Sequence, residues 1–407
     1  MEKRFLWGTA TAAHQIEGGN RNNDWWEWEQ LGHIKGGGSC EIACDSWNRW
    51  RQDLYLAQEL NTNAYRFSLE WSRIEPEEGR FDPEAIDHYR EMLQEMRRRE
   101  IEPIVTLHHF TIPLWLAHKG GYEHPDFPAY FERFCQNVVP LYAPFVRYWI
   151  TINEPNVIAA LGYLFGIFPP GVQSFSRCGR VLKQFLLAHA RAYRIIKNAA
   201  PESLVSVAIN VQNISPASGS PLDRLAAGLV DQFYNRGFLK AMVDGRTRMP
   251  FGWGSRIPGL ANTLDYVGLN YYSRIFIGFR WRGGFAEVRK AVPRSDMDQE
   301  IYPQGFYQAI QQVAAYRKPI LITESGIADA RDQYRPDYLQ QVIGGMRQAM
   351  REGIPILGYL HWSLMDNFEW NEGYSQKFGL YEMDFTTLER KPRPSAQLFR
   401  TICSGER

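Results

Sequence analysis

Eight short apolar segments, separated by stretches with helical periodicity, most restrict what this chain can fold into. Most are almost continuously apolar, which is typical of strands covered on both faces of a sheet. Strands that alternate with helices predict parallel pairing through helical crossovers. The predicted strands are residues 4–11, 63–69, 102–109, 147–153, 204–210, 265–272, 319–325 and 355–362.

Three of the intervening stretches carry an apolar face at helical spacing. The first begins with Asp82, which suits an N-cap, and Pro83, which suits a first turn. The last should end near Gly353. The predicted helices and their buried faces are 81–99 with Ile86, Tyr89, Leu93 and Met96; 305–318 with Phe306, Ile310, Val313 and Tyr316; and 336–353 with Leu339, Val342, Ile343, Met346 and Met350.

Eight strand and helix units favour an α/β fold of the closed (β/α)8 or TIM-barrel type. A bare barrel needs roughly 250 residues, whereas this chain has 407. We therefore expect a single domain, residues 1–407, with extended βα loops. The alternative is an open doubly wound sheet, which usually carries a glycine-rich phosphate turn after its first strand. The segment GTATAAHQ, residues 8–15, is not such a turn.

Charge and composition argue against several classes of protein. The net charge is +1, so neither a nucleic-acid partner nor an acidic membrane surface is expected. No segment approaches the ~20 apolar residues of a membrane span, and the N-terminal segment lacks the apolar core of a signal peptide. The five cysteines are scattered, which favours free thiols in a reducing compartment and hence a cytoplasmic location.

Polar side chains gather where the predicted strands end, and in a barrel the chemistry is built at the C-terminal ends of the strands. YWITINEPN, residues 148–156, turns polar at Asn153 and Glu154, and ILIT is followed directly by Glu324. An unpaired buried carboxylate costs several kcal/mol. Two of them among further polar and aromatic groups therefore indicate a functional site. The other residues at or near strand ends are Gln15, Arg66, His109, Asn270, Tyr272 and Trp362.

Two carboxyl groups beside aromatic side chains fit the hydrolysis of a glycosidic bond. One would protonate the leaving oxygen, and the other would attack the anomeric carbon or activate a water molecule. A separation of about 5–5.5 Å gives retention of configuration, and roughly 6.5–9.5 Å gives inversion. The spacing in the sequence leaves both geometries open. Aromatic residues make up 14% of the chain, and they serve either as core or as flat walls for sugars.

The ordered set of motifs resembles glycoside hydrolase family 1, the β-glucosidase and β-glycosidase family. It covers nearly the whole chain in the order FLWGTATAAHQIEG, RFSLEWSRIEP, LHHFTIP, TINEPN, GLNYYS, ITESG and HWSLMDNFEWNEGYSQKFGL. The resemblance implies retaining hydrolysis of terminal non-reducing β-D-glucosides, with β-D-fucosides and β-D-galactosides also accepted. It implies that the enzyme needs no cofactor and that its small-molecule partners are β-glycosides and oligosaccharides. It also leaves open a homo-oligomer.

The resemblance also implies a role for each site residue. Glu154 would be the acid/base and Glu324 the nucleophile, which Arg66 and Tyr272 would hold ionised. A drier setting or the neighbouring anion would raise the pKa of Glu154. Asn153 would bind the sugar 2-OH. The other expected sugar contacts are Gln15 and Glu369 on the 4-OH side, His109 at the 3-OH, Trp362 as the floor, Phe378 near the 6-position, Trp370 and Asn270.

Several alternatives stay open within this scaffold. A transglycosidase would use the same covalent intermediate. A 6-phospho-β-glycosidase is disfavoured because the Glu369 carboxylate would repel phosphate, and an inactive sugar-binding protein is disfavoured because both glutamates are present. A metal is not expected, since the neighbours His108 and His109 should point to opposite faces of their strand. Phe110 stands where the family usually has Trp, which leaves the aglycone preference open.

Overall fold

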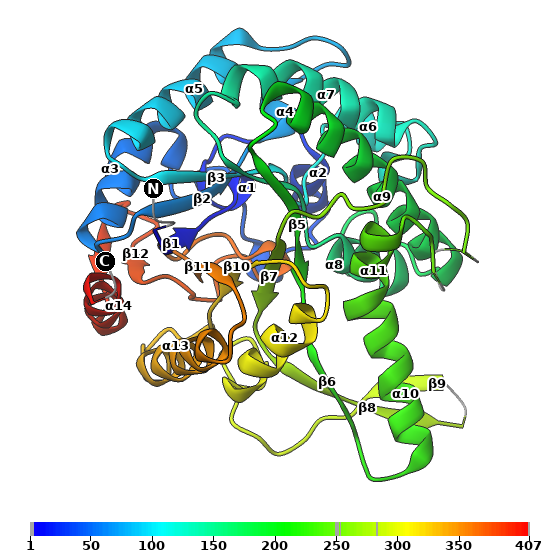
Figure 1. Cartoon of the computed structure of the whole chain (residues 1–407). Helices are drawn as coiled ribbons and strands as arrows, with labels where there is room; N and C mark the ends of the chain where they lie inside the picture. The colour runs from blue at the N-terminus through cyan, green and yellow to red at the C-terminus, as the bar shows by residue number, and fades with distance from the viewer. Residues whose placement is uncertain (1–3, 249–251, 253, 282–283, 406–407) are drawn as a thin grey trace.

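Eight parallel strands close into a barrel, with helices around the outside (Figure 1). The structure is a computed structural model that describes residues 4–248, 252, 254–281 and 284–405. The order around the barrel is β1-β11-β10-β7-β5-β4-β3-β2. Every predicted strand is present, so the predicted fold class is confirmed. The barrel strands are β1 (Leu6–Ala10), β2 (Ala64–Ser68), β3 (Glu102–His108), β4 (Tyr148–Asn153), β5 (Leu204–Asn210), β7 (Val267–Tyr271), β10 (Ile320–Ser325) and β11 (Ile356–Trp362).

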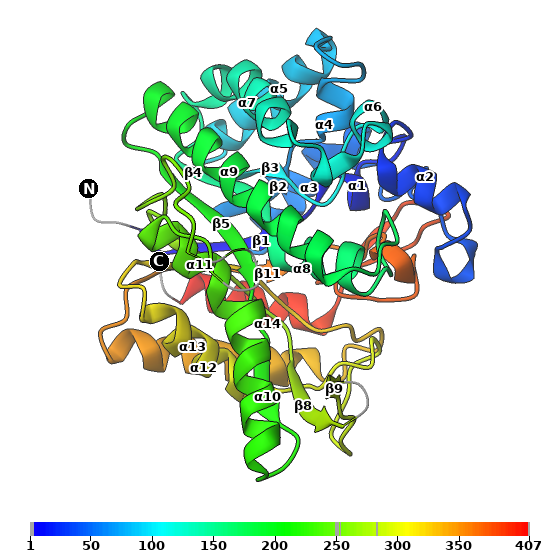
Figure 2. The ribbon, with the colours of Figure 1, turned by 90° about the vertical axis from the view of Figure 1, so that its right-hand side faces the viewer.

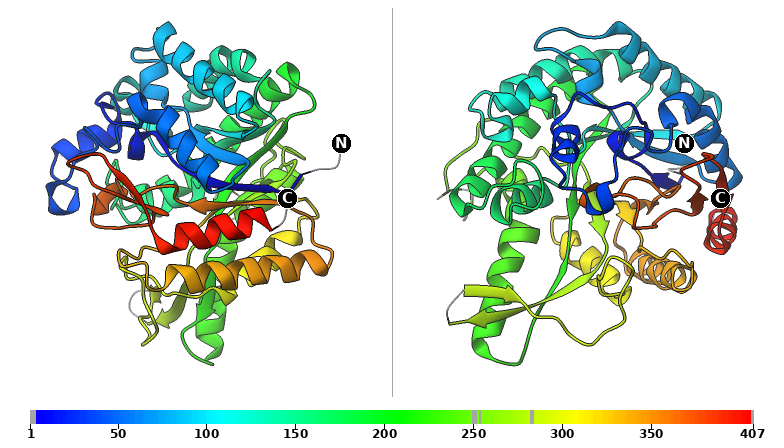
Figure 3. Two further views of the ribbon diagram at one scale, coloured as in Figure 1. Left: turned by 90° about the vertical axis from the view of Figure 1, so that its left-hand side faces the viewer. Right: turned by 180° about the vertical axis from the view of Figure 1, so that it is seen from behind.

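Helices cover the outer face of the barrel, and α13 and α14 lie side by side (Figure 3, orange and red). No helix in the described part of the chain combines the length and the apolar character that crossing a membrane requires. The α-helices are α1 (Ala13–Ile16), α2 (Asp24–Gln30), α3 (Ser46–Glu59), α4 (Trp71–Ile74), α5 (Pro83–Arg98), α6 (Leu114–His118), α7 (Phe127–Tyr142), α8 (Pro155–Ala159), α9 (Phe175–Ala199), α10 (Pro221–Asp231), α11 (Gly237–Asp244), α12 (Gln304–Ala314), α13 (Arg335–Arg351) and α14 (Pro394–Ser404).

The predicted helices form, with one error in a buried face and one at a helix end. Asp82 caps α5 by accepting the backbone N–H of Glu84 at 2.8 Å, as predicted. Met350 is wrong, because it lies in the last turn of α13 and is 37% exposed. Tyr316 packs against the main core cluster but lies beyond the helix: α12 ends at Ala314, and the chain then turns through the left-handed conformation of Arg317 (φ 56°).

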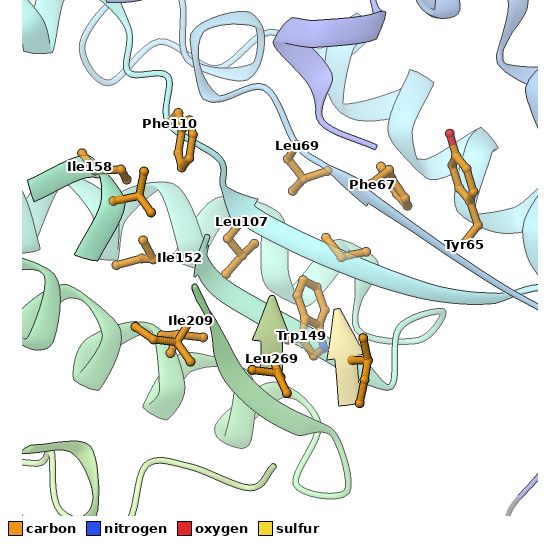
Figure 4. Close-up of a cluster of buried hydrophobic side chains, with 14 of the residues drawn as sticks. Tyr65, Phe67, Leu69, Leu107, Phe110, Trp149, Ile152, Ile158, Ile209 and Leu269 are labelled. Atoms are coloured by element: carbon orange, nitrogen blue, oxygen red, sulfur yellow. The ribbon is translucent and has the colours of Figure 1, made fainter. Parts of the chain in front are cut away.

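Apolar side chains of the strands pack on both faces of the barrel wall. Phe67, Leu107 and Trp149 belong to the large buried cluster shown in Figure 4, which includes residues of the covering helices. Ile104, three positions before Leu107 on β3, and Ile150, one position after Trp149 on β4, belong to a second cluster made largely of barrel-strand residues. Burying one such side chain contributes roughly 1.5–3 kcal/mol, so both layers hold the strand ends rigidly.

The extra length lies in long connections between the barrel elements. After β5 and β7, the strands β6 (Asn213–Pro216), β8 (Arg274–Arg280) and β9 (Gly284–Glu287) form a separate sheet in the order β6-β8-β9. Helix α10 packs on this sheet away from the barrel (Figure 2). Smaller elements are β12 (Tyr381–Met383), β13 (Arg390–Pro392), η1 (Lys35–Gly37), η2 (Gly121–Glu123), η3 (Ala160–Leu164), η4 (Gln232–Arg236) and η5 (Trp370–Glu372).

Candidate active site

A cavity of about 500 Å³ opens at the C-terminal ends of the barrel strands. Most of the predicted site residues line it: His109, Asn153, Glu154, Tyr272, Glu324, Trp362, Glu369, Trp370 and Phe378. The other three, Gln15, Arg66 and Asn270, are fully buried and hydrogen-bond to lining residues. The structure therefore brings all of the predicted site residues together.

Irregular backbone at two strand ends aims the two carboxyl groups into this cavity. The pairing of β4 with β5 shifts between Ile150 and Asn153, and the pairing of β10 with β7 shifts between Ile322 and Glu324. A bulge interrupts the strict alternation of side chains between the two faces of a strand. Asn153 and Glu154 both line the cavity because Glu154 lies one residue beyond β4 and has a left-handed backbone.

Glu154 occupies a sharp turn between β4 and α8. Its backbone is left-handed (φ 44°), a conformation that costs a non-glycine residue of order 1 kcal/mol or more. Pro155 begins α8 directly afterwards, so the strand cannot continue. Two side-chain amides donate to Glu154 Oε1, from Asn270 at 2.8 Å and from Asn210 at 2.9 Å.

The surroundings of Glu154 favour its protonated form. Burial, followed by the charge of Glu324, raises the pKa of Glu154 to about 8. The two amide donors lower this pKa but do not offset the burial. At neutral pH the group therefore retains a proton, as a general acid requires.

Glu324 has a different set of partners. Arg66 Nη1 lies 2.5 Å from Oε1, and the hydroxyl of Tyr272 donates to Oε2. Burial raises the pKa of Glu324, whereas the charge of Arg66 and the hydrogen bond from Tyr272 lower it. The expected partners are in place, but burial outweighs them. Glu154 has no cation among its hydrogen-bond donors, so its ionised form is the less stabilised of the two.

Asn153 is fixed by three neighbours. Arg66 Nη2 and Asn270 Nδ2 donate to Asn153 Oδ1 at 2.7 and 3.2 Å, and Asn153 Nδ2 lies 3.1 Å from His109 Nε2. Burial and the charge of Arg66 hold the pKa of His109 well below its usual range, so this ring is neutral. No described residue bonds the buried Nδ1 of His109, which leaves this nitrogen free to bind a hydroxyl.

Gln15 and Glu369 form a polar end to the cavity. Gln15 Nε2 donates to Glu369 Oε2 at 3.2 Å and to the backbone oxygen of Phe368 at 2.8 Å. Burial, followed by the charge of Glu324, raises the pKa of Glu369 to about 8. In the described part of the chain the buried Gln15 Oε1 has no partner. A ligand with several hydroxyls would satisfy these groups.

Aromatic rings supply the apolar walls. The ring of Trp362 lies 6.0 Å from that of His109 at an interplanar angle of 22°. Trp370 packs against Trp25 with ring centroids 4.6 Å apart, and Phe378 lies edge-on to Tyr272 at 6.0 Å. Flat rings beside hydrogen-bonding groups suit a pyranose, which has apolar faces and a polar rim.

Two residues near Glu154 were not predicted from the sequence as part of the site. Asn210 ends β5 and donates to Glu154, so the same search along strand ends would have found it. Tyr234 lies in η4, and its hydroxyl donates to Asn210 Oδ1 at 3.3 Å; no pattern in the sequence marks it. His108 faces away from the cavity, with Nε2 3.0 Å from the hydroxyl of Tyr122.

One group of possible metal ligands lies behind Gln15. Single ligand atoms of His14, Glu29 and Cys40 lie within 4.8 Å of one another. His14 Nε2 is 3.1 Å from Glu29 Oε1, and Nδ1 faces the amides of Asn20 and Asn23. Hydrogen bonds thus occupy both ring nitrogens. No disulfide joins the five cysteines, which all lie in the described part of the chain and are buried.

The family comparison decides how this arrangement of groups is classified. The model of glycosyl hydrolase family 1 matches residues 1–407. The chain belongs to glycosyl hydrolase family 1. It is a β-glycosidase, in agreement with the relatives and solved structures that it matches over nearly its whole length.

Three family 1 comparisons illustrate the likeness. Beta-glucosidase A of Thermotoga maritima is 33% identical over 429 aligned positions, covering 98% of this chain and 96% of the relative. The structure of a beta-glycosidase from Pyrococcus horikoshii is 37% identical with a TM-score of 0.93, covering 100% of this chain and 95% of the other. A beta-glucosidase from Thermotoga maritima in complex with glucoimidazole is 31% identical with a TM-score of 0.93, covering 100% and 99%.

Proposed function

We propose that this family 1 enzyme hydrolyses terminal non-reducing β-D-glucosides with retention, using Glu324 as the nucleophile and Glu154 as the acid/base. The observation that carries this assignment is the unequal setting of two carboxyl groups that line one cavity. Arg66 and Tyr272 bind Glu324, whereas only neutral amides bind Glu154. The partners of Glu324 favour the ionised carboxylate, and the surroundings of Glu154 favour the protonated carboxylic acid, as the two roles require.

In the first step an oxygen of Glu324 attacks the anomeric carbon, and the bond to the aglycone oxygen breaks. The proton of Glu154 passes to that oxygen, so the aglycone leaves as a neutral alcohol. The product is a glycosyl ester of Glu324. Arg66 and Asn153 remain hydrogen-bonded to each other, and the Asn153 amide binds the 2-OH, a contact that strengthens in the transition state.

In the second step water attacks the anomeric carbon and releases Glu324. Glu154, now ionised, takes a proton from this water and returns to its starting state. Esterification of Glu324 removes the negative charge that raised the pKa of Glu154. The fall in that pKa favours the ionised form of Glu154, which is the base that this step requires.

The polar end of the cavity supports an unphosphorylated sugar. The repulsion between Glu369 and Glu324 already contributes to the raised pKa of Glu369. A phosphate at the sugar 6-position would add about two negative charges to this buried cluster. The hydroxyls of glucose can instead bind Glu369, Gln15 and His109. β-D-Fucosides and β-D-galactosides are proposed as further substrates.

The test of the catalytic roles uses Glu324→Ala and an aryl β-glucoside. We expect turnover to vanish and azide to restore it, giving an α-glycosyl azide because the anion attacks from the face that Glu324 occupied. Glu324→Ala with wild-type activity would overturn the assignment. Glu59→Ala is the matched control, since Glu59 is exposed at the end of α3, and it should keep wild-type turnover.

We also propose that residues 1–407 act as one domain, with the βα loops completing the cavity. The absence of disulfides among the five described cysteines supports a reducing, cytoplasmic setting. Oligosaccharides with a non-reducing β-glucoside are included among the substrates.

A further inference from the structure

The side-chain hydrogen bonds of Glu154 reach one of its two carboxyl oxygens. Asn270 Nδ2 and Asn210 Nδ2 donate to Oε1 at 2.8 and 2.9 Å. No described residue bonds Oε2, although the residue is 6% exposed and lines the catalytic cavity. Two donors engage both lone pairs of Oε1. The acid proton of Glu154 therefore belongs on Oε2, which is left for the substrate.

A hydroxyl group orients each of the two amides. The hydroxyl of Tyr234 donates to Asn210 Oδ1 at 3.3 Å, and the hydroxyl of Thr323 donates to Asn270 Oδ1 at 2.6 Å. Because a donor holds the oxygen of each amide, the nitrogen faces Glu154. An amide turned the other way would present its oxygen to Glu154 and accept a hydrogen bond from the acid proton. The two hydroxyl groups oppose that orientation.

Tyr234 belongs to the π-helical turn η4, and two buried asparagine side chains tie this turn to the end of β5. Asn156 Nδ2 donates to the backbone oxygens of Asn210 at 2.8 Å and of Tyr234 at 3.1 Å. Asn235 Oδ1 accepts the backbone N–H of Gln212 at 3.0 Å, and its Nδ2 donates to the backbone oxygen of Gln212 at 2.8 Å. Turns of this kind are rare and frequently lie at functional sites. The hydroxyl of Tyr234 is therefore held firmly against Asn210.

Tyr234 differs from Thr323 in its distance from the reacting groups. Thr323 directly precedes Glu324 on β10, so a change there would disturb both carboxyl groups. The hydroxyl of Tyr234 bonds Asn210 and no other described residue. Burial, followed by the charge of Glu154, holds the pKa of Tyr234 well above its usual range, so the hydroxyl stays protonated and remains a donor.

We propose that Tyr234 is a positioning residue that acts through Asn210: its hydroxyl keeps Oε1 of Glu154 unprotonated and so leaves the acid proton on Oε2, free to pass to the oxygen of the leaving group. The inference rests on the proposed function, in which Glu154 is the acid. Tyr234 and Asn210 exchange no proton during the reaction. The proton passes from Oε2 to the aglycone oxygen as the glycosidic bond breaks, and water restores it in the second step.

Other titratable and charged groups also face Glu154. Among the described residues they are Glu324 on β10, Arg66 on β2, Tyr272 directly after β7 and Glu369 directly before η5. The side-chain hydrogen bonds of Asn210 go instead to Glu154 and Tyr234. Removing the hydroxyl of Tyr234 thus leaves the contacts of these other groups in place.

The test replaces Tyr234 by phenylalanine, which keeps the ring and removes the hydroxyl. Asn210 can then turn its oxygen toward protonated Glu154, which holds the acid proton back. We expect kcat/KM for methyl β-glucoside to fall roughly tenfold, and kcat/KM for 2,4-dinitrophenyl β-glucoside, whose leaving group needs no proton, to stay within about twofold. The pH at which kcat/KM falls on the alkaline side should rise by about half a unit or more. Equal losses for the two substrates, or an alkaline fall at unchanged or lower pH, would overturn the inference.

Tyr316→Phe is the matched control. The hydroxyl of Tyr316 donates to the backbone oxygen of Arg236 at 3.2 Å, so it bonds the same π-helical turn from outside the cavity lining. We expect both glucosides to keep their wild-type kcat/KM. A loss confined to methyl β-glucoside in Tyr316→Phe would show that loosening η4 causes the effect, and it would overturn the role of the bond to Asn210.

A double-mutant cycle tests whether Tyr234 acts through Asn210. In the Asn210→Ala background Tyr234→Phe should cause no further change in kcat/KM or in its pH dependence, because the amide that the hydroxyl orients is gone. The same loss in both backgrounds would mean that Tyr234 acts by another route, and the inference would be wrong.

A measurement without substrate separates this inference from the proposed function. Carbon-13 NMR of protein labelled at the glutamate carboxyl carbon follows the titration of Glu154, whose signal is identified by its loss in Glu154→Gln. A higher pKa of Glu154 in Tyr234→Phe would support the inference even if the wild-type protein hydrolysed no glucoside, a result that would overturn the proposed function. An unchanged pKa in a protein that hydrolyses glucosides would overturn the inference alone.

Discussion

The Arg66 guanidinium lies 2.5 Å from Glu324 Oε1, and this contact joins the ends of β2 and β10 inside the barrel. The two residues are 258 positions apart in the sequence. Arg66 also donates to Asn153 Oδ1 at 2.7 Å and is fully buried. Its charge is thus weakly screened and is the main influence that lowers the pKa of Glu324 against burial.

Replacing Arg66 by methionine should make Glu324 harder to ionise. Glu324 must be ionised to attack, so the acidic limb of kcat/KM against pH should move upward by about one pH unit or more. Activity at neutral pH should fall roughly 100-fold. Arg133→Met is the control, because Arg133 pairs with Glu75 and Glu78 outside the cavity lining. An unshifted acidic limb in Arg66→Met would contradict this role.

The fall of kcat/KM at alkaline pH, its alkaline limb, should report the loss of the proton from Glu154. Its pKa is raised to about 8, and the proton must be present for the first step, so kcat/KM should fall as the pH rises through about 8. Glu154→Gln should abolish this limb and slow alkyl glucosides by about 10²–10⁴-fold. A 2,4-dinitrophenyl glucoside should lose much less in the first step, since its leaving group needs no proton. Equal losses for both substrates would argue against an acid role.

Asn210→Ala should displace the same limb in a predictable direction. The Asn210 amide donates to Glu154 and lowers its pKa. Without this donor the pKa of Glu154 rises, so the alkaline limb should move to higher pH. Asn213→Ala is the control, because the Asn213 side chain bonds Gln308 outside the cavity lining. A limb that moves to lower pH in Asn210→Ala would refute the assignment.

Glu369→Gln tests which sugar the polar end of the cavity accepts. Losing a hydrogen-bonded carboxyl group should reduce kcat/KM for an aryl β-glucoside by about 10- to 100-fold. Removing the ionisable group should also raise the relative rate of the 6-phosphoglucoside, most clearly above about pH 8, where Glu369 is ionised. Glu389→Gln should change this ratio much less, because Glu389 is paired with Lys391 at an exposed position outside the cavity lining. Aryl glycosides that differ at C4 and C6 give the measurement.

The barrel could be predicted because its signal is local and repeated. Each strand, such as β5, is short, apolar and bounded by turn residues, and the alternation with helices excludes most other topologies. The start of α5 was predicted because its cap, Asp82, bonds a backbone N–H only two residues away. Met350 was misassigned because its spacing matches the apolar face, but exposure depends on how far the neighbouring elements extend along α13.

The site was predicted less completely. Asn210 is a polar residue at the end of a strand, so the search for such residues could have found it. Tyr234 comes from a π-helical turn that has no signal in the sequence. The hollow beside the catalytic cavity, which is lined largely by apolar side chains, was not predicted either. Phe165, Leu229 and Phe285 are ordinary apolar residues in their own segments, and only their packing reveals a common surface.

The sequence by itself determined the order of eight strands and the residues at their ends, because periodicity and turn chemistry are encoded in neighbouring residues. Only the tertiary structure decided that Asn153 and Glu154 share one cavity, and that Thr323 bonds Asn270 while Glu324 bonds Arg66. Strict alternation sends consecutive strand residues to opposite faces. The register shift in β10 and the left-handed turn at Glu154, just beyond β4, overcome that rule, and a shift in register is a property of paired strands, absent from either strand alone.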